Sequence, residues 1–504
     1  MAHDERAARS AHERWRGGLT IAAALPILAL AWWLRSPLHD LPLERDEGAY
    51  ATIAARWLAG DALYRDLFDH KPPLVYMVFG MARLLGDEPV RAIRTLATLY
   101  LLAGASALFA LAWRLYGRWA ALAALPVFLA YASSLRFQGL TFNSEAVLAL
   151  PATLGCLLAT SAMRARRASL LALAGVCVGL AIAAKPVGAS LLAPLLLAPL
   201  LLGWPPWRRW AGAGLALGGA ALPLLGLGLL LWRQGALAAA YEALVSYNRL
   251  YAAESLAQGW DPLWLWRIWA PMLALGLPGL AGLAAAAGWR EWRTPAHGIA
   301  ALWGLMLLAT ALLSLRSYPH YYLAAVPLLS LWAGAGLAAA GRLIGGARLR
   351  PLALPLGLAL LAALLAPPLR EIWPLRAQSP EQQIGALYGP DGDKYFGPAA
   401  EVAGYVARRV PPGQPIFVWA AEPEIYYLAQ RRPATRFVYD YPLDRLPGAR
   451  EQALGALRAA PPPLIITYHD VRPLGFHPFM FDYAYELSAT IGGYDLYELP
   501  QAAR

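Results

Sequence analysis

The sequence predicts a mainly helical, multi-pass membrane protein with a small α/β domain at its C-terminal end. Of its 504 residues, 59% are hydrophobic and only 15% are charged, whereas charged residues make up about 25% of soluble domains. A soluble globule of this length has too little interior to bury so much apolar surface, and a disordered chain is poorer in apolar residues. The apolar residues also gather in runs of about 20, the length that a helix needs to cross a bilayer.

The first apolar run, 18–35, follows a tail of mixed charge. It is longer than the apolar part of a signal peptide and has no small-residue cleavage site, so we interpret it as an uncleaved anchor. Further runs lie at 90–113, 119–135, 145–163, 168–184, 187–203, 211–232, 263–288, 296–315, 321–341 and 351–369. Residues 1–369 are therefore expected to form a bundle of about 11 transmembrane helices, with a range of 11–13.

The net charge of +11 does not indicate a nucleic-acid partner, because the arginines cluster in short loops between apolar runs, as in membrane proteins. If the short apolar stretch 74–85 does not cross, these loops all lie on the side of the N-terminus: Arg114/Arg118, Arg164/Arg166/Arg167, Arg208/Arg209, Arg290/Arg293 and Arg342/Arg348/Arg350. The positive-inside rule then places the N-terminus in the cytoplasm of a cell with this protein in its inner (plasma) membrane. Residues 74–85 are expected to dip into, or lie on, the outer leaflet.

Two segments then lie outside the cell. Residues 36–89 form a long, acidic first outer loop, and residues 370–504 form an extracytoplasmic soluble domain. In that domain PIFVWA and PLIITY read as short buried strands, and 399–409 and 448–459 as helices, which predicts an α/β fold. The aromatic-rich loop 233–262 is expected to lie at the lipid interface.

The first outer loop holds the densest group of polar residues. Asp46 and Glu47 open a predicted helix over 47–59, and the helix dipole stabilises acidic residues in a first turn, which explains the pair without any function. A functional role is favoured because unneeded charge is rare at a membrane boundary. Gly48, directly after the pair, also permits close approach of another group. Asp46 and Glu47 are therefore candidate catalytic residues.

A second ionic cluster, Asp69-His70-Lys71, directly precedes Pro72-Pro73 and the apolar stretch 74–85. Proline pairs start helices, so Lys71 is expected at the positive end of the helix that follows. A cation at that position makes an anion site. The alternative is a lysine that only extends to the lipid headgroups.

Other boundary residues are weaker candidates. Arg316, His320 and Tyr321 lie between two spans, and Lys185 lies at another outer boundary, where such residues are also common membrane anchors. Asn143 and Glu145 are expected to cap the start of a span. No spacing of the types H-x-x-x-H or C-x-x-C predicts a metal site. A divalent metal between Asp46, Glu47 and a phosphate is chemically compatible with these residues, but no spacing demands it, and no cofactor is predicted.

The runs DEGAYATIAARWLAG and YRDLFDHKPPLVY resemble the first outer loop of bacterial GT-C glycosyltransferases, in particular the protein-mannosyltransferase-like and aminoarabinose-transferase-like enzymes (glycosyltransferase family 39 type). VRAIRTLATLY is similar to the family's second span, and RSYPHYYLAAVPLLSLWAG to a late span boundary. The resemblance implies a GT-C type bundle, a polyprenyl-phosphate sugar donor and an inverting transfer outside the cytoplasm. His70 departs from the Glu that the aminoarabinose enzymes often carry there, and a lipid A acceptor is not supported.

The resemblance also implies residue roles. Asp46 matches the proposed general base and Glu47 its partner. Residues that match donor-phosphate contacts are Lys71, Arg94, more distantly Arg91, and the late-boundary residues Arg316, His320 and Tyr321.

Elementary chemistry agrees with these roles. A base must take the proton of the acceptor hydroxyl, and positive charge must stabilise the departing phosphate. The sequence has no G-x-G-x-x-G after a strand and no P-loop, the usual nucleotide-binding motifs.

Two other functions stay open. A transporter or lipid-linked-sugar flippase would not need covalent chemistry, although such proteins often contain inverted repeats and mid-membrane charges, and no convincing repeat is visible. An O-antigen-type ligase or polymerase would keep the lipid donor and change the acceptor. The acceptor itself, whether protein, lipid or polysaccharide, is not predicted.

Overall fold

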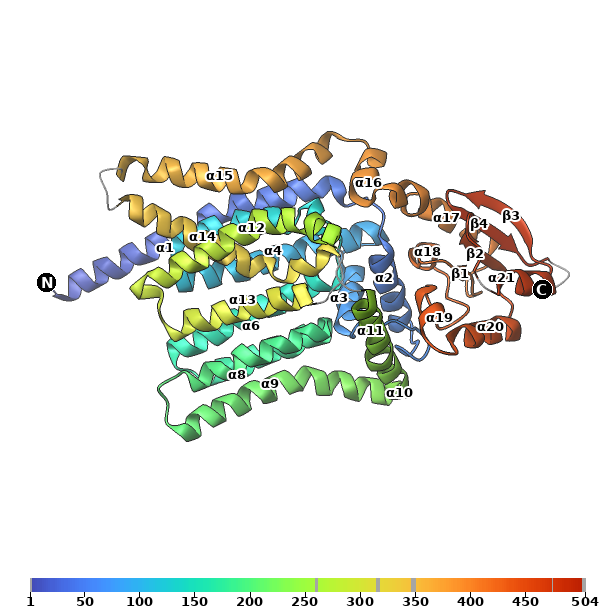
Figure 1. Cartoon of the computed structure of the whole chain (residues 1–504), viewed down its shortest axis with the longest axis horizontal. Helices are drawn as coiled ribbons and strands as arrows, with labels where there is room; N and C mark the ends of the chain where they lie inside the picture. The colour runs from blue at the N-terminus through green and yellow to red at the C-terminus, as the bar shows by residue number, and fades with distance from the viewer. Residues whose placement is uncertain (1, 259–261, 314–317, 346–349, 474, 501–504) are drawn as a thin grey trace.

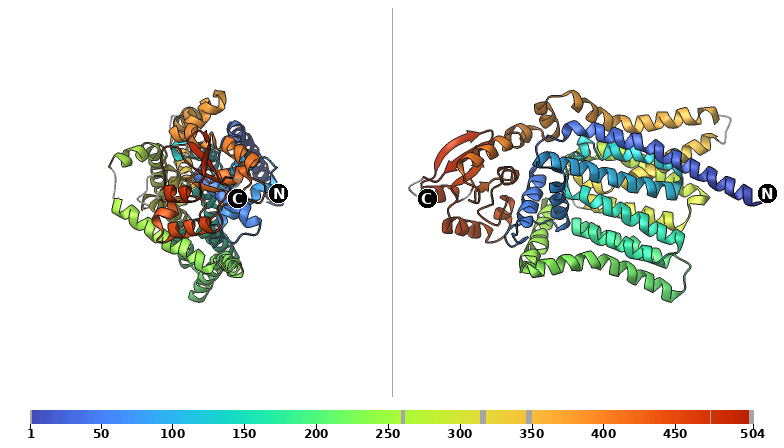
Figure 2. Two further views of the ribbon diagram at one scale, coloured as in Figure 1. Left: turned by 90° about the vertical axis from the view of Figure 1, so that its right-hand side faces the viewer. Right: turned by 180° about the vertical axis from the view of Figure 1, so that it is seen from behind.

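The computed structural model describes residues 2–258, 262–313, 318–345, 350–473 and 475–500. Long helices lie side by side in a bundle, short helices lie across one end of it, and a domain with a small sheet follows beyond them (Figure 1). The view from behind in Figure 2 shows the same three layers. The N-terminus lies at the far end of the bundle, and the C-terminus lies in the sheet domain.

Each predicted span falls on a helix of the bundle. The helices are α1 (Ala2–Arg35), α4 (Pro89–Tyr116), α5 (Arg118–Tyr131), α6 (Ser144–Ala165), α7 (Ser169–Ala184), α8 (Leu192–Leu200), α9 (Pro206–Arg233), α12 (Pro262–Gly288), α13 (Pro295–Leu313), α14 (Val326–Gly345) and α15 (Ala353–Ile372). Within the described residues, seven helices are long and apolar enough to cross a membrane, and shorter apolar helices lie among them. The chain is thus a multi-pass membrane protein, and the count of about 11 spans stays a prediction.

Small residues let the bundle helices approach closely. A Cβ atom at Gly175 of α7 would overlap the carbonyl oxygen of Ala216 on α9, and one at Gly282 of α12 would overlap that of Trp332 on α14. Lipid tails are as apolar as the side chains, so such close packing is a main source of helix association in a bilayer.

Short helices form the layer at the end of the bundle: α2 (Arg45–Leu58), α3 (Leu74–Gly80), η2 (Met81–Leu84), α10 (Leu237–Tyr241), η5 (Glu242–Tyr247) and α11 (Asn248–Gln258). Together α3 and η2 cover the apolar stretch that was expected not to cross. Their length of roughly 20 Å falls short of the roughly 30 Å of a hydrocarbon core, in agreement with that expectation. Further 3-10 helices join the longer elements: η1 (Ser36–Leu38), η3 (Leu135–Phe137), η4 (Pro186–Leu191), η6 (Arg290–Trp292), η7 (Pro319–Ala324), η8 (Arg350–Leu352) and η9 (Trp373–Ala377).

The C-terminal domain contains a four-stranded sheet in the order β1-β2-β4-β3. Its strands are β1 (Phe417–Trp419), β2 (Leu464–Tyr468), β3 (Glu486–Ile491) and β4 (Tyr494–Glu498), and its helices are α16 (Pro380–Tyr388), η10 (Gly392–Phe396), α17 (Ala399–Arg409), α18 (Glu424–Ala429), α19 (Tyr441–Arg445), α20 (Ala449–Ala459) and α21 (Phe476–Asp482). Strands β1 and β2 are the two predicted strands and pair in parallel, with Phe417 opposite Ile465. β4 pairs antiparallel with both β2 and β3.

The domain packs onto α2 through the residues around α18. The Thr52 hydroxyl donates a hydrogen bond of 2.7 Å to the carbonyl of Pro423, and the Arg45 guanidinium lies 2.7 Å from Glu422. A Cβ atom at Gly48 would lie 2.7 Å from the backbone nitrogen of Glu424, so only glycine allows this approach. The domain is therefore fixed to the helix on which Asp46 lies.

Candidate active site

Glu47 is a buried anchor of α2. Its side chain is 0% exposed and accepts hydrogen bonds from Arg94 at 2.5 Å and from the backbone of Phe142 at 2.6 Å. It also closes a capping box with Glu44, whose backbone N–H donates to the Glu47 carboxylate at 3.1 Å. Such reciprocal caps fix the first turn of a helix, so Glu47 fixes the start of α2.

Arg94 belongs to the same anchor. Besides Glu47, its guanidinium donates to the carbonyl groups of Leu140 and Pro42 and to the hydroxyl of Tyr388. Arg91, one turn earlier, forms an exposed ion pair with Asp40 at 2.8 Å. The structure therefore places the two candidate arginines of α4 in contact with protein acidic groups, and it does not bring either of them into contact with Lys71.

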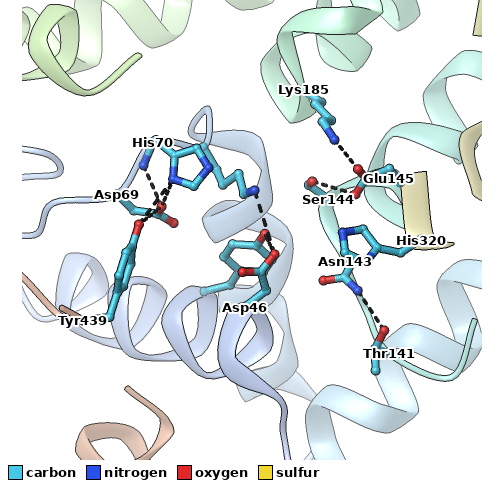
Figure 3. Close-up of polar contacts among 12 residues, drawn as sticks. Asp46, Asp69, His70, Thr141, Asn143, Ser144, Glu145, Lys185, His320 and Tyr439 are labelled. Atoms are coloured by element: carbon cyan, nitrogen blue, oxygen red, sulfur yellow. Dashed lines mark hydrogen bonds and ion pairs between the residues drawn. The ribbon is translucent and has the colours of Figure 1, made fainter. Parts of the chain in front are cut away.

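Asp46 has a different environment from its neighbour Glu47. Its side chain is 39% exposed and lies 3.8 Å from the ammonium of Lys71, whose side chain is 11% exposed. The Tyr50 hydroxyl, one turn along α2, donates to the Asp46 carboxylate at 3.1 Å. Asp46 and Lys71, singled out separately in the sequence, are thus brought together in the structure. Figure 3 shows Asp46 beside the segment that carries Asp69 and His70.

A network of tyrosines holds the segment that carries Lys71. Tyr439 of the C-terminal domain and Tyr76 of α3 donate to the carboxylate of Asp69 at 2.7 and 2.8 Å. The backbone carbonyl of Lys71 accepts from Tyr64 at 2.8 Å and from Tyr76 at 3.2 Å. The backbone of Lys71 is therefore fixed independently of its side chain.

Charge in this segment is stable near neutral pH. Burial alone would raise the pKa of Asp69, but hydrogen bonds from His70 and Tyr439, together with the charge of Lys71, lower that pKa to about 2. Burial alone would lower the pKa of Lys71, but Asp46 and other nearby groups raise that pKa above its ordinary value. The site thus presents a carboxylate beside a permanent ammonium.

His70 supports Lys71 from the other side. Its ring lies against Tyr247 and Tyr251, at 5.3 and 5.6 Å between ring centroids, and its Nδ1 lies 3.1 Å from Asp69. These tyrosines belong to the aromatic loop that was expected at the lipid interface. Tyr247 is instead buried, at 1% exposed, and packs on the candidate site.

A second ionic group faces the first (Figure 3). Lys185 forms an ion pair with Glu145 at the start of α6, and its ammonium lies 3.7 Å from the centroid of the Tyr321 ring. The Nδ1 of His320 donates a hydrogen bond of 2.6 Å to the amide oxygen of Gln138. The Tyr321 ring therefore belongs to this second group.

The structure does not treat all the sequence candidates alike. Arg316 lies outside the described residues. Glu145, expected only to cap α6, is also the partner of Lys185. Tyr439 donates a hydrogen bond to Asp69 and was not a candidate in the sequence. A single tyrosine has no local pattern that predicts a contact with a residue 370 positions away. Among the described residues, no group of three or more His, Cys, Asp or Glu side chains is arranged to hold a metal ion.

The arrangement combines two chemical elements. A half-exposed carboxylate is suited to accept a proton, and a fixed, charged ammonium beside it is suited to bind a phosphate or another developing negative charge. Lys185 is paired with Glu145 and Lys71 with Asp46, so each of the two cations has a carboxylate partner.

Proteins of known structure share this fold. ArnT from Cupriavidus metallidurans in the apo state is similar to this chain with a TM-score of 0.60 and 16% sequence identity, over 98% of this chain and 99% of that one. ArnT from the same organism bound to undecaprenyl phosphate gives a TM-score of 0.59 and 16% identity, over 96% of this chain and 98% of that one. The Archaeoglobus fulgidus oligosaccharyltransferase in complex with Zn and sulfate gives a TM-score of 0.53 and 14% identity, over 94% of this chain and 73% of that one.

Sequence comparison reaches part of the chain. Residues 69–232, which begin with the Asp69-His70-Lys71 segment, match the family model of dolichyl-phosphate-mannose-protein mannosyltransferases. No match is found among curated proteins. The resemblance drawn from the sequence is thus confirmed: the chain has the fold of the GT-C glycosyltransferases, and residues 69–232 match a mannosyltransferase family of that class.

Proposed function

We propose that this chain is an integral-membrane glycosyltransferase that moves a sugar from a polyprenyl-phosphate donor to an acceptor on the extracytoplasmic side. The observation that carries the proposal is the half-exposed Asp46 carboxylate 3.8 Å from the Lys71 ammonium, at the junction of the bundle and the C-terminal domain. The complex of the similar ArnT with undecaprenyl phosphate supports a donor of that class.

In the proposed reaction, Asp46 accepts the proton of an acceptor hydroxyl while the hydroxyl oxygen attacks the anomeric carbon of the sugar. The bond between that carbon and the phosphate oxygen breaks, and the polyprenyl phosphate leaves with the bonding electrons. Attack opposite to the leaving group inverts the configuration of the sugar. Lys71 stabilises the charge that develops on the phosphate.

The other candidates support these two residues. Tyr321 and His320 are proposed to contact the donor phosphate from the opposite wall, with Lys185 holding the Tyr321 ring. Arg316 keeps its proposed role as a phosphate contact. Because all three nitrogen atoms of the Arg94 guanidinium donate to protein acceptors, we assign Arg94 and Glu47 a positioning role. His70 likewise positions Lys71, and Arg91 is assigned to the surface.

The experiment that tests this proposal uses a strain that lacks the protein. Mass spectrometry of its envelope glycans, glycolipids and glycoproteins should reveal one missing sugar, which the wild-type gene restores. Asp46→Asn should not restore the sugar. Asp40→Asn is the matched control, because Asp40 is an exposed acid of the same loop, paired with Arg91, and it should restore the sugar fully.

Two outcomes would contradict the proposal. Full restoration by Asp46→Asn would remove Asp46 as the base. A deletion strain in which a lipid-linked sugar accumulates at the cytoplasmic face, with every transfer reaction intact in membrane extracts, would identify a flippase instead.

A further inference from the structure

A cavity of about 500 Å³ lies beside α2, and neither Asp46 nor Lys71 lines it. Its α2 residues include Ala51, Ala54 and Ala55. The tyrosines that bond to Asp46 or to the backbone of Lys71, which are Tyr50, Tyr64 and Tyr76, do not line it either. The cavity is thus separate from the proposed active site and lies between α2, α3, η2 and α18.

The walls of this cavity are amphipathic. Part of the lining is small or apolar, with Ala54, Phe79, Ala82 and Ala92. The other part is polar, and this set comprises Arg56, Arg83, Asp87, Tyr427, Gln430 and Arg431. Three arginines against one aspartate give the polar wall a positive balance.

The three arginines differ in their availability. Arg431 is 7% exposed and donates to the carbonyl groups of Val410 and Ala429. Arg56 binds Asp61 at 2.7 Å. Arg83 is exposed, and among the described residues no hydrogen bond or ion pair of its side chain is found, so its guanidinium is the cation that can accept an external anion.

Tyr427 lies near Arg83. Burial raises the pKa of Tyr427, and the Arg83 charge lowers it, so the hydroxyl and the guanidinium are within electrostatic reach of each other. A guanidinium with a nearby hydroxyl is a suitable pair of donors for a phosphate group.

Large apolar side chains are exposed next to the cavity. On η2, which carries Arg83, Met81 is 51% and Leu84 81% exposed. Met77 on α3 is 45% and Leu58 at the end of α2 is 56% exposed. η2 directly follows α3, which lies at the end of the bundle (Figure 1), where we expect the lipid headgroups to lie. Exposed apolar residues beside a basic residue at that depth are typical of contact with anionic lipid.

We propose that this cavity binds the phosphate headgroup of an anionic membrane lipid, with Arg83 and Tyr427 at the phosphate and the acyl chains over Met81 and Leu84. A soluble phosphate ester has the same headgroup chemistry but no partner for the exposed apolar residues. The lipid is a resident ligand and not the sugar donor, because the Lys71 site is separate.

Native mass spectrometry of the full-length protein, titrated in detergent with phosphatidylglycerol, tests the proposal. Arg83→Gln removes the charge at an exposed position and should weaken lipid binding about tenfold, the effect of losing one charge-assisted contact. Ala55→Phe keeps every charge and fills the cavity, and should weaken binding to a similar extent. Arg458→Gln, at an exposed arginine on α20, is the matched control and should bind as the wild type does.

The outcomes are distinct. Wild-type affinity in both Arg83→Gln and Ala55→Phe would overturn the site, and a loss of equal size in Arg458→Gln would reduce it to general surface charge. Glycerol 1-phosphate separates the two sources of phosphate. Weak competition by this ester supports a lipid, whereas competition at the same concentration as phosphatidylglycerol would overturn the lipid assignment.

Discussion

Asp46 and Glu47 are neighbours in the sequence and have opposite environments. Successive residues of a helix point about 100° apart, so one of the two can face the site while the other faces the protein. Glu47 is 0% exposed and Asp46 is 39% exposed. Glu47 fixes the first turn of α2, and this turn holds Asp46 near Lys71 while the Asp46 side chain stays accessible to a substrate.

The buried pair of Glu47 and Arg94 should be important for stability. Replacing Arg94 by Met leaves Glu47 buried without its partner, and we expect a loss of about 3–5 kcal/mol in the free energy of unfolding, measured by thermal unfolding in detergent. Arg91→Met is the matched control on the same helix. It breaks an exposed pair, which is worth about 0–1 kcal/mol. Equal melting temperatures of the two variants would show that Glu47 is not an anchor.

Lys71 should determine affinity for the donor phosphate. Lys71→Ala should bind undecaprenyl phosphate at least about tenfold more weakly than the wild type, because one charge-assisted contact is lost, and Lys71→Arg should recover most of the binding. The backbone contacts of residue 71 are unaffected by the side chain, so the fold should persist. The only other lysines are Lys185 and Lys394, and Lys394→Ala, at an exposed ion pair with Asp470, is the control. Equal affinity in all four proteins would leave Lys71 as a simple anchor.

At the scale of elements, α2 joins the two parts of the molecule. Its first turn is anchored through Glu47 to Arg94 of α4 and to the backbone of Phe142. Its next turns pack on the residues around α18 through Gly48 and Thr52. A shift of the C-terminal domain would therefore move the helix that carries the proposed base.

Gly48→Ala should loosen this contact. The added methyl group would lie 2.7 Å from the Glu424 backbone nitrogen, and overpacking of this kind costs about 1–3 kcal/mol. We expect faster hydrogen exchange in α18 and lower transferase activity. Gly385→Ala, at a helical glycine with open space around it, should change neither property. Unchanged exchange in Gly48→Ala would show that the two elements do not need this close approach.

The elements differ in how well the sequence predicted them. The bundle helices were found because a span needs a long apolar run, and β1 and β2 because each is a short buried run between turns. The hairpin of β3 and β4 was missed: β3 is largely exposed, so its sequence ELSATI lacks a buried, alternating pattern. In the site, Asp46 and Lys71 were predicted from local signals, whereas Tyr439 and the pairing of Arg94 with Glu47 depend on tertiary contacts that one sequence does not reveal.

At the scale of the whole molecule, the contact between the bundle and the C-terminal domain is rich in buried acid. Glu44, Glu422 and Glu424 each have a buried carboxylate oxygen without a hydrogen-bond partner in the part of the chain that the structure describes, and so does Asp440. Arg45 pairs with Glu422 and Asp391. Burial raises the pKa of Glu424 well above its ordinary value.

This acidic contact predicts a pH dependence. Burial, together with the charges of Glu422 and Asp444, raises the pKa of Asp440 from 3.8 to about 6, against a smaller lowering by Arg45. The folded state then binds the proton more tightly than the unfolded state, so this contribution to stability is complete below about pH 4 and is lost as pH rises through about 6. The melting temperature of the wild-type protein should therefore fall between about pH 4 and 6, and Asp440→Asn should make this fall smaller. Asp482→Asn, at an exposed acid, should leave the pH profile unchanged, and an unchanged profile in Asp440→Asn would exclude this origin.

Tyr439 reaches Asp69 across 370 positions of the chain. During synthesis, the loop with Lys71 would leave the membrane long before residue 439 has been made. On the proposed topology, the loop gains the Tyr439 donor only when the C-terminal domain has been translocated and folded against it. An enzyme built in this way becomes competent at the end of its own biogenesis, and an incomplete chain in the membrane would not consume the lipid-linked sugar around it.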